Sequence, residues 1–212
     1  MRFTQASDGD LRVGQPRDQV EATRRRVLDL PWTWLHQVHG DKVVAVGHPG
    51  QWAGADADAA VTDQPGAALA IHTADCVPLA LVGPDGVVGA VHAGWRGLAA
   101  GVVEATVHEM RRLGAGDIHG VVGPCIHAEC YEFGPAELAA IADRYGPEVV
   151  GRTGGGTPAL DMPAAVTAAL RQADVADVEV VPVCTACDRS FFSHRARGDI
   201  GRQALLVWTD EP

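Results

Sequence analysis

Two histidines and one cysteine stand beside turns in the first half of the chain. His39 lies in "HQVHG", Cys76 ends "TADC" and His92 begins "HAGWRG". Two imidazoles and one thiolate form a donor set that suits zinc, and three protein ligands leave a fourth position for water or substrate. On spacing alone an alternative stays open, in which Cys76 is a small buried residue and the histidines are ordinary core or surface groups.

Neighbouring residues could support such a site. Asp75 precedes Cys76 and could orient a ligand or cap a turn. The glycine-flanked turn at 92–97 opens a helix, and free backbone N–H groups there, together with Arg96, suit a phosphate or a carboxylate. The simpler interpretation is that Trp95 packs in the interior while Arg96 covers the start of the helix.

A basic and aromatic segment lies near the end of the chain, in "FFSHRARGDIGR". Arg195 and its basic neighbours could bind an anionic substrate, and Phe191 or Phe192 could stack on a planar ring. The alternative is a solvated loop before the last strand.

Two further motifs contain cysteines, "HAEC" at 127–130 and "CTAC" at 184–187. Together they partly match the zinc nucleobase-deaminase signature, but Pro182 does not directly precede Cys184 and the two halves are widely separated. A redox role for the Cys-x-x-Cys pair lacks its usual βαβ context. We therefore interpret both motifs as mainly structural.

The elements that must position these residues alternate irregularly. Apolar periodicity and end signals predict helices over 16–30, 98–113, 134–146 and 161–175, the last with Asp161 as N-cap. Short apolar or β-branched runs predict strands at 42–47, 67–72, 117–123, 178–185 and 203–208, and a hairpin from 76–83 and 87–92 across a Pro-Asp-Gly turn. The Gly-rich segment 151–158 is expected to be a mobile loop. The order predicts one mixed-sheet α+β domain over 1–212.

Composition limits the function classes. Asp and Glu outnumber Lys and Arg by 27 to 17, so a nucleic-acid partner is not expected. The first residues show no apolar signal core, and no apolar run is long enough to span a bilayer, so we expect no membrane partner and a cytoplasmic location. Five cysteines without a dense paired pattern favour reduced thiols, metal ligands or a nucleophile over disulfides.

Taken in order, six segments resemble the polyphenol oxidase or laccase-domain family. They are "HQVHG", the stretch through "TADC", "HAGWRG", "GPCI" with "CYEFG", "CTACDRSFFSHR" and "GRQALLVW". The family is described as zinc-dependent purine nucleoside phosphorylases with adenosine deaminase activity. The resemblance implies that His39, Cys76 and His92 bind Zn²⁺, and it implies an irregular mixed β-sandwich flanked by helices, similar to a cysteine-hydrolase toxin.

The resemblance also implies a chemistry. Zinc would polarise the attacking oxygen, either of water in deamination of adenosine or of phosphate in phosphorolysis of adenosine, inosine, guanosine and methylthioadenosine. Arg24, Arg96 and Arg195 are expected to hold phosphate.

The chain departs from the family pattern in several places. The usual Gly-rich opening is replaced by "FTQASDGDLRVGQ", Thr23 precedes Arg24 where Asn is common, and "SHRARGD" breaks the usual double Arg. These changes leave the three expected ligands in place and affect the substrate side.

Three alternative functions remain. In a cysteine amidase, Cys76 would be the nucleophile and His92 its base, acting on cell-wall precursor peptides as peptidoglycan editing factors do. A copper polyphenol oxidase is less expected, because the sequence has no His-x-His pair and only three methionines. A non-enzymatic domain with a structural zinc is the third.

Overall fold

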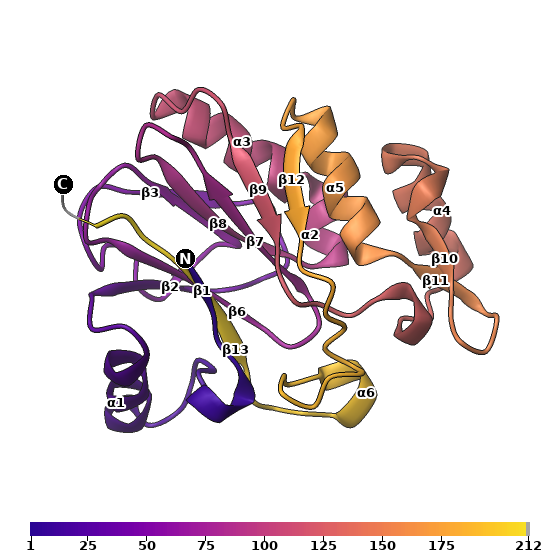
Figure 1. Ribbon diagram of the computed structural model, residues 1–212, viewed down its shortest axis with the longest axis horizontal. Coiled ribbons are helices and arrows are strands. Elements are labelled where there is room, and N and C mark those ends of the chain that lie inside the picture. The colour runs from indigo at the N-terminus through magenta and orange to yellow at the C-terminus, as the bar shows by residue number, and fades with distance from the viewer. Residues whose placement is uncertain (211–212) are drawn as a thin grey trace.

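Two mixed β-sheets lie face to face in the computed structural model, which describes residues 1–210 (Figure 1). Apolar side chains from both sheets, including Leu69, Ile71 and Val44, form the core between them. The strands of the smaller sheet, in spatial order, are β1 (Arg2–Phe3), β13 (Gln203–Val207), β6 (Ala68–Thr73), β2 (Trp32–His36) and β4 (Ala55–Asp56). The strands of the larger sheet are β12 (Asp177–Val180), β9 (His119–Val122), β7 (Val77–Val82), β8 (Val88–Ala93), β5 (Ala59–Thr62) and β3 (Val43–Val46).

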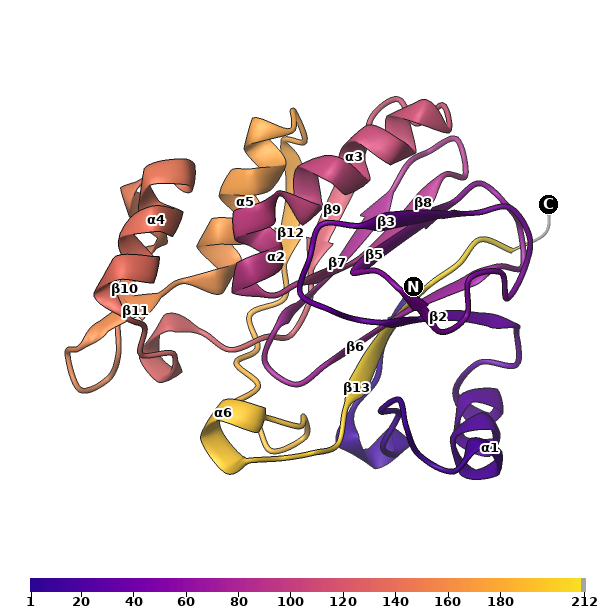
Figure 2. The same ribbon diagram turned by 180° about the vertical axis from the view of Figure 1, so that it is seen from behind.

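Helices cover the outer face of each sheet. The helix α1 (Arg17–Val27) lies on the outer side of the smaller sheet, where Val27 packs with Leu11 and Trp32. The remaining long helices lie on the opposite side of the molecule, over the larger sheet and beside it, as the view from behind shows (Figure 2). They are α2 (Trp95–Ala100), α3 (Val102–Arg112), α4 (Pro135–Tyr145) and α5 (Met162–Gln172). A short helix, α6 (His194–Arg197), follows the last long loop.

Local sequence explains several element boundaries. The carboxylate of Asp161 accepts a hydrogen bond from the backbone of Ala164 at 2.9 Å and caps α5. Pro135 occupies the first turn of α4, where its missing N–H costs nothing. Gly101, at φ 101°, adopts a left-handed conformation that ends α2 and begins α3.

The predicted α+β sandwich with flanking helices is confirmed, and so is the hairpin. In that hairpin β7 and β8 pair antiparallel from Val77 opposite Ala93 to Val82 opposite Val88. The two sheets mix parallel and antiparallel neighbours, as expected from an order without strict βαβ alternation.

Other predictions need correction. The Gly-rich segment 151–158 is not simply a mobile loop, because β10 (Val150–Arg152) and β11 (Pro158–Leu160) pair as a hairpin there. Thr153 and Thr157 close its turn through their hydroxyl groups, 2.7 Å apart. The helix predicted to run from 98 is two helices, and the strand predicted over 178–185 ends at Val180. Strands β1, β2, β4 and β5 were not predicted. The strands β1 and β4 are only two residues long, β2 has Thr33 between apolar residues, and β5 is rich in alanine, which has a low strand propensity.

Within residues 1–210, no helix combines the length and the apolar character needed to cross a bilayer.

Candidate metal centre and substrate pocket

His39, Cys76 and His92 meet at one end of the sandwich. Their ligand atoms all lie within 4.8 Å of one another. The Cys76 Sγ atom is 4.0 Å from His39 Nε2, and the two imidazole rings meet edge to face with centroids 4.7 Å apart. The hairpin register brings Cys76 and His92 together, because Cys76 directly precedes β7 and His92 lies near the end of the antiparallel β8. The loop after β2 brings His39.

A buried carboxylate fixes two of these side chains. Asp58 is fully buried, and its Oδ1 atom lies 2.8 Å from His92 Nδ1 and accepts a hydrogen bond from the backbone of His39 at 2.9 Å. Its Oδ2 atom accepts hydrogen bonds from the backbone of Val38 and Gly40. These bonds hold His39 at φ 60°, an unusual conformation for a residue with a side chain. Asp58 therefore orients His92 and shapes the His39 loop together.

Gly94, which has no side chain, leaves space for His39 and Cys76. A Cβ atom added there would lie 2.8 Å from the His39 ring and 3.3 Å from Cys76 Sγ. The absent side chain gives His39 and Cys76 room to approach one another. Together with the donor set of two nitrogens and one sulfur, this arrangement fits a single borderline-soft ion such as Zn²⁺.

The three groups perturb one another electrostatically. Burial alone would raise the pKa of Cys76, but the charge of His92 and hydrogen bonds with both imidazoles outweigh it and lower the pKa to about 6. Burial alone would lower the pKa of His92, but the Cys76 charge and the Asp58 carboxylate raise it to about 9. In the metal-free protein Cys76 and His92 therefore form a thiolate and imidazolium pair at neutral pH.

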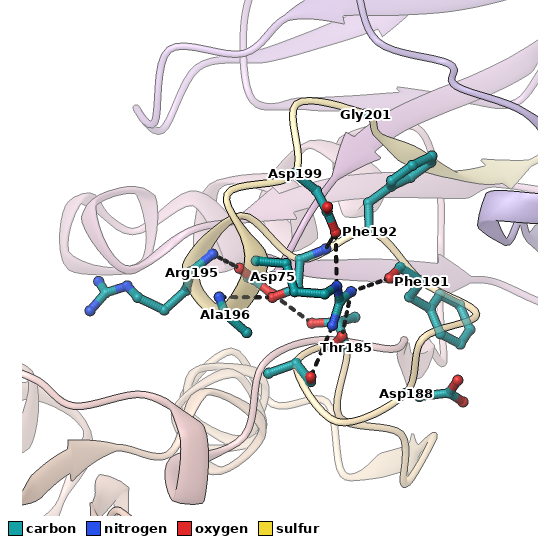
Figure 3. Close-up of polar contacts among 12 residues, drawn as sticks. Asp75, Thr185, Asp188, Phe191, Phe192, Arg195, Ala196, Asp199 and Gly201 are labelled. Carbon is teal, nitrogen blue, oxygen red and sulfur yellow. Dashed lines mark hydrogen bonds and ion pairs between the residues drawn. The ribbon is translucent and has the colours of Figure 1, made fainter.

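Asp75 does not touch the three ligands through its carboxylate. Its Oδ1 atom accepts a hydrogen bond from Thr185 Oγ1 at 2.8 Å, and its Oδ2 atom accepts one from the backbone of Arg195 at 2.7 Å (Figure 3). Its backbone carbonyl accepts a hydrogen bond from Ile126. Asp75, at φ 96°, thus anchors the turn before Cys76 to the segment 184–197, which supports the expected orienting role through the backbone.

A pocket of about 540 Å³ opens beside the three ligands. Its volume is in the range of small-molecule sites. Besides the ligands, its walls combine apolar residues such as Leu35 and Ile200 with basic and polar ones, which are Arg12, His36, Gln37, His72, His194 and Arg202. In a protein of net charge −10, the two arginines of this wall favour an anionic or polar small molecule.

His72 is the most unusual member of the wall. Its side chain is buried, with 6% of the residue exposed, yet neither ring nitrogen has a hydrogen-bond partner within the protein. Burial and the positive charges of Arg24, His92 and Arg202 lower the pKa of His72 to about 3. A neutral imidazole therefore offers the pocket one donor and one acceptor.

The three arginines expected to hold phosphate lie in different places. Arg24 lines a second pocket, which shares Val13 with the first, and its guanidinium lies over the rings of Trp32 and Trp34. Burial lowers the pKa of Arg24 to about 10, which leaves it charged at neutral pH.

Arg96 and Arg195 are exposed and do not line the ligand pocket. The Arg96 guanidinium lies 4.5 Å from the Trp95 ring centroid, and that of Arg195 lies 4.8 Å from the Tyr131 ring centroid. Phe191 and Phe192 do not line the pocket either: Phe191 is buried, and Phe192 packs against Gly201.

Sequence reasoning missed Asp58, His72 and Arg12, whereas His194 and Arg202, two members of the basic segment expected to bind an anion, do line the pocket. The one local signal was for Asp58, a carboxylate directly before the apolar run of β5. For His72 and Arg12, the sequence carries no local pattern that distinguishes them from surface residues.

The two cysteine motifs also come together. Glu129, Cys130, Cys184 and Cys187 place their ligand atoms within 4.8 Å of one another. They form a second cluster, separate from the His39, Cys76 and His92 group.

The chain matches known proteins over nearly its whole length. Residues 4–210 match the family model described as "Multi-copper polyphenol oxidoreductase laccase". A Streptomyces coelicolor protein named purine nucleoside phosphorylase is 44% identical over 181 residues, covering 84% of this chain and 74% of that protein. A Mycobacterium tuberculosis protein of the same name is 39% identical over 207 residues, covering 93% and 82%.

Solved structures share the fold. The crystal structure of YlmD from Geobacillus stearothermophilus superposes with a TM-score of 0.84 at 32% identity, covering 95% of this chain and 85% of that one. That of the hypothetical protein YfiH from Bacillus licheniformis gives a TM-score of 0.87 at 28% identity, covering 98% and 91%.

Proposed function

We propose that this chain, which belongs to the multi-copper polyphenol oxidoreductase laccase family, is a zinc-dependent purine nucleoside phosphorylase. Such an enzyme breaks the bond between ribose C1′ and the purine nitrogen and transfers the ribosyl group to inorganic phosphate. The observation that carries the proposal is the opening of a basic pocket onto His39, Cys76 and His92. The names of the relatives at up to 44% identity support this reaction class.

His39, Cys76 and His92 would hold the zinc. When bound there, zinc supplies Lewis acidity next to the reacting oxygen. The protein fixes the geometry of the ligands. Asp58 contacts Nδ1 of His92, so that the Nε2 atom of His92 is left to face His39 and Cys76. Three protein ligands would leave one coordination position of the zinc for water or substrate.

Donor chemistry favours zinc over copper. A blue-copper centre adds a weak axial ligand, usually methionine, to its His₂Cys set. Met110 and Met162 are instead fully buried in the helix-covered core, and no methionine among the described residues lines the pocket.

Arg24 and Arg12 are proposed to provide the phosphate end of the pocket. Both stand near Val13, which is shared by the two adjoining cavities. Arg12 is paired with Asp10 at 3.0 Å, whereas Arg24 stacks on tryptophans and carries its charge close enough to affect His72. A fork of N–H donors at this end would orient phosphate by its oxygens. Arg96 and Arg195 remain predictions for the same role and are tested alongside.

His72 is proposed to contact the nucleoside. Its imidazole is neutral, and its two unpartnered nitrogens can donate to and accept from a ribose hydroxyl or a purine edge. Satisfying a buried polar group in this way favours a substrate with matching groups over an apolar one.

Chromatography of nucleosides incubated with the enzyme tests the proposal. Adenosine, inosine and guanosine should each release the free base and ribose 1-phosphate only when phosphate is present. Inosine formed from adenosine without phosphate would identify the adenosine deaminase activity that we propose as a second reaction of this pocket. Absence of all three bases from zinc-loaded protein would refute the phosphorylase.

A cysteine amidase is the second candidate, because Cys76, His92 and Asp58 also form a connected series. Asp58 pairs with His92, and His92 lowers the pKa of Cys76 to about 6. This is the arrangement of a nucleophile, its base and the group that orients the base. An amidase would work after chelation and would be trapped covalently by an electrophilic peptide analogue, whereas zinc should protect Cys76 from such a reagent.

A further inference from the structure

The second cysteine cluster lies away from the pocket and has no part in the proposed reaction. Glu129 and Cys130 belong to a short 3₁₀ turn, η2 (Ala128–Cys130), while Cys184 and Cys187 come from the turn that follows β12. Five cysteines are present in the chain, all with free thiols. Three of them gather at this one point.

The spacing of the donor atoms fits a tetrahedral ion. With zinc–sulfur bonds of about 2.3 Å, two thiolates of a tetrahedral site lie about 3.8 Å apart. Cys130 Sγ and Cys187 Sγ are 3.4 Å apart, and all four donor atoms lie within 4.8 Å of one another. Three sulfurs and one carboxylate oxygen are therefore close enough together to bind one ion.

Backbone contacts organise the cluster as they do in Cys-x-x-Cys metal turns. The N–H groups of Cys187 and Asp188 donate to the carbonyl of Cys184, which closes the turn between the two cysteines. The N–H of His127 donates to Cys184 Sγ at 3.4 Å. A sulfur that accepts a backbone hydrogen bond is better suited to carry the negative charge of a metal-bound thiolate.

We propose that Glu129, Cys130, Cys184 and Cys187 form a second, structural zinc site. Four protein donors fill the coordination shell, so the site leaves no position for a substrate. It joins two segments that are distant in the sequence, and it therefore closes a long loop of chain.

The second site would brace the first through Asp75. Thr185 lies between the two cysteines of the turn and donates to Asp75, and the same segment continues to Arg195, whose backbone also holds Asp75 (Figure 3). Asp75 directly precedes Cys76. Losing the second ion would loosen this segment and, through it, the backbone that positions Cys76.

Metal analysis of protein purified under anaerobic, reducing conditions and equilibrated with zinc tests the proposal. The wild-type chain should hold two zinc ions. Cys187→Ser and Cys130→Ser should each hold one, Cys76→Ala should also hold one, and a Cys76→Ala, Cys187→Ser double variant should hold none. Cys125→Ala is the matched control: this buried cysteine neighbours the cluster without belonging to it, so the variant should hold two.

Cobalt reconstitution gives a readout that does not depend on loss of folding. Wild-type protein should show strong thiolate-to-cobalt charge-transfer absorption from four sulfurs and Cys76→Ala from the three of the second site, and Cys187→Ser should lose most of it. Circular dichroism identifies a cysteine variant that is merely unfolded. If Cys187→Ser is unfolded, the cobalt spectrum of Cys76→Ala shows whether the second site binds metal through three sulfurs.

Two results would overturn the second site. One is that Cys76→Ala removes all bound zinc, while Cys130 and Cys187 of the native protein react freely with an alkylating reagent. The other is a Cys130–Cys187 disulfide in protein kept reduced, which would indicate a redox pair instead. Failure of phosphorolysis with two zinc ions bound would count against the proposed function and not against this site.

Discussion

His92 Nδ1 lies 2.8 Å from Asp58 Oδ1, and both side chains are buried. The same carboxylate accepts three backbone hydrogen bonds from residues 38–40, so one acidic group connects the strand that carries His92 to the loop that carries His39. Hydrogen bonds from His92, Gly40 and His39 outweigh burial and lower the pKa of Asp58. The relationship makes Asp58 the organising group of the proposed metal centre.

Replacing Asp58 by Asn should therefore weaken zinc binding. The amide keeps one acceptor oxygen, but an NH₂ donor replaces the other oxygen. This donor would face either His92 or the N–H groups of Val38 and Gly40, and it can accept no hydrogen bond in either position. We expect zinc affinity to fall about 10- to 100-fold, as for other partners of metal-binding histidines. Competition with a chromophoric chelator measures it.

The exposed pair of His36 and Asp56, which lie 2.7 Å apart, supplies the control. Asp56→Asn should leave zinc affinity unchanged. Equal affinities in wild type and folded Asp58→Asn would contradict the role of Asp58.

Gly94→Ala should damage the metal centre without damaging the fold. The backbone at Gly94, with φ −75° and ψ 158°, suits alanine, but the new Cβ would lie 2.8 Å from the His39 ring. We expect a lower zinc affinity and a lower kcat/KM, with an unchanged midpoint of thermal unfolding of the metal-free protein. Gly116→Ala, where the new Cβ meets nothing closer than 3.6 Å, should behave as wild type. A Gly94→Ala enzyme with wild-type zinc affinity would show that the space at Gly94 is not needed.

His72 should make the stability of the metal-free protein depend on pH. Its pKa is about 3 when folded, against an ordinary value of 6.5, so the unfolded chain takes up a proton first as pH falls. The stability is fully present above pH 6.5 and decreases below it, by about 2 kcal/mol between pH 7 and pH 5.

Denaturant unfolding at both pH values measures this decrease. His72→Gln should make the decrease about 2 kcal/mol smaller, while His48→Gln, at an exposed position, should leave it unchanged. Identical pH dependence in wild type and His72→Gln would mean that His72 gains access to solvent or a partner when protonated.

The arginines can be ranked by their effect on phosphate. Arg24→Gln should raise the KM for phosphate about tenfold or more, corresponding to loss of a charge-assisted contact. Arg96→Gln is expected to change it less, because its guanidinium lies on Trp95 outside the pocket lining. Initial rates at varied phosphate and fixed inosine give the two KM values. A larger increase for Arg96→Gln than for Arg24→Gln would place the phosphate site beside Trp95.

Local sequence patterns were sufficient for the fold class and for most elements of the larger sheet. Alternating and β-branched runs predict β7, β8 and β9 directly, and Asp161 and Pro135 mark helix starts. The hairpin of β10 and β11 was missed because three consecutive glycines, which suggest mobility, sit in its turn.

The supporting residues were harder to predict, because their partners are distant along the chain. Asp58 binds His92 across 34 positions, and Cys130 meets Cys187 across 57. His72 is recognisable only once its buried nitrogens are seen to lack partners. The three expected ligands were singled out by residue type and by their positions beside turns, the motif resemblance strengthened that hypothesis, and the structure adds the geometry that brings them together.

His39, Cys76 and His92 are proposed to hold one zinc ion on which phosphorolysis depends. Metal-free protein titrated with zinc, with inosine phosphorolysis followed at each addition, tests it most directly. Wild type should bind one zinc ion more than Cys76→Ala does. We predict that activity returns in proportion to the binding of this additional ion, and that Cys76→Ala stays inactive while folded. Full phosphorolysis by metal-free protein, or by Cys76→Ala, would contradict the claim.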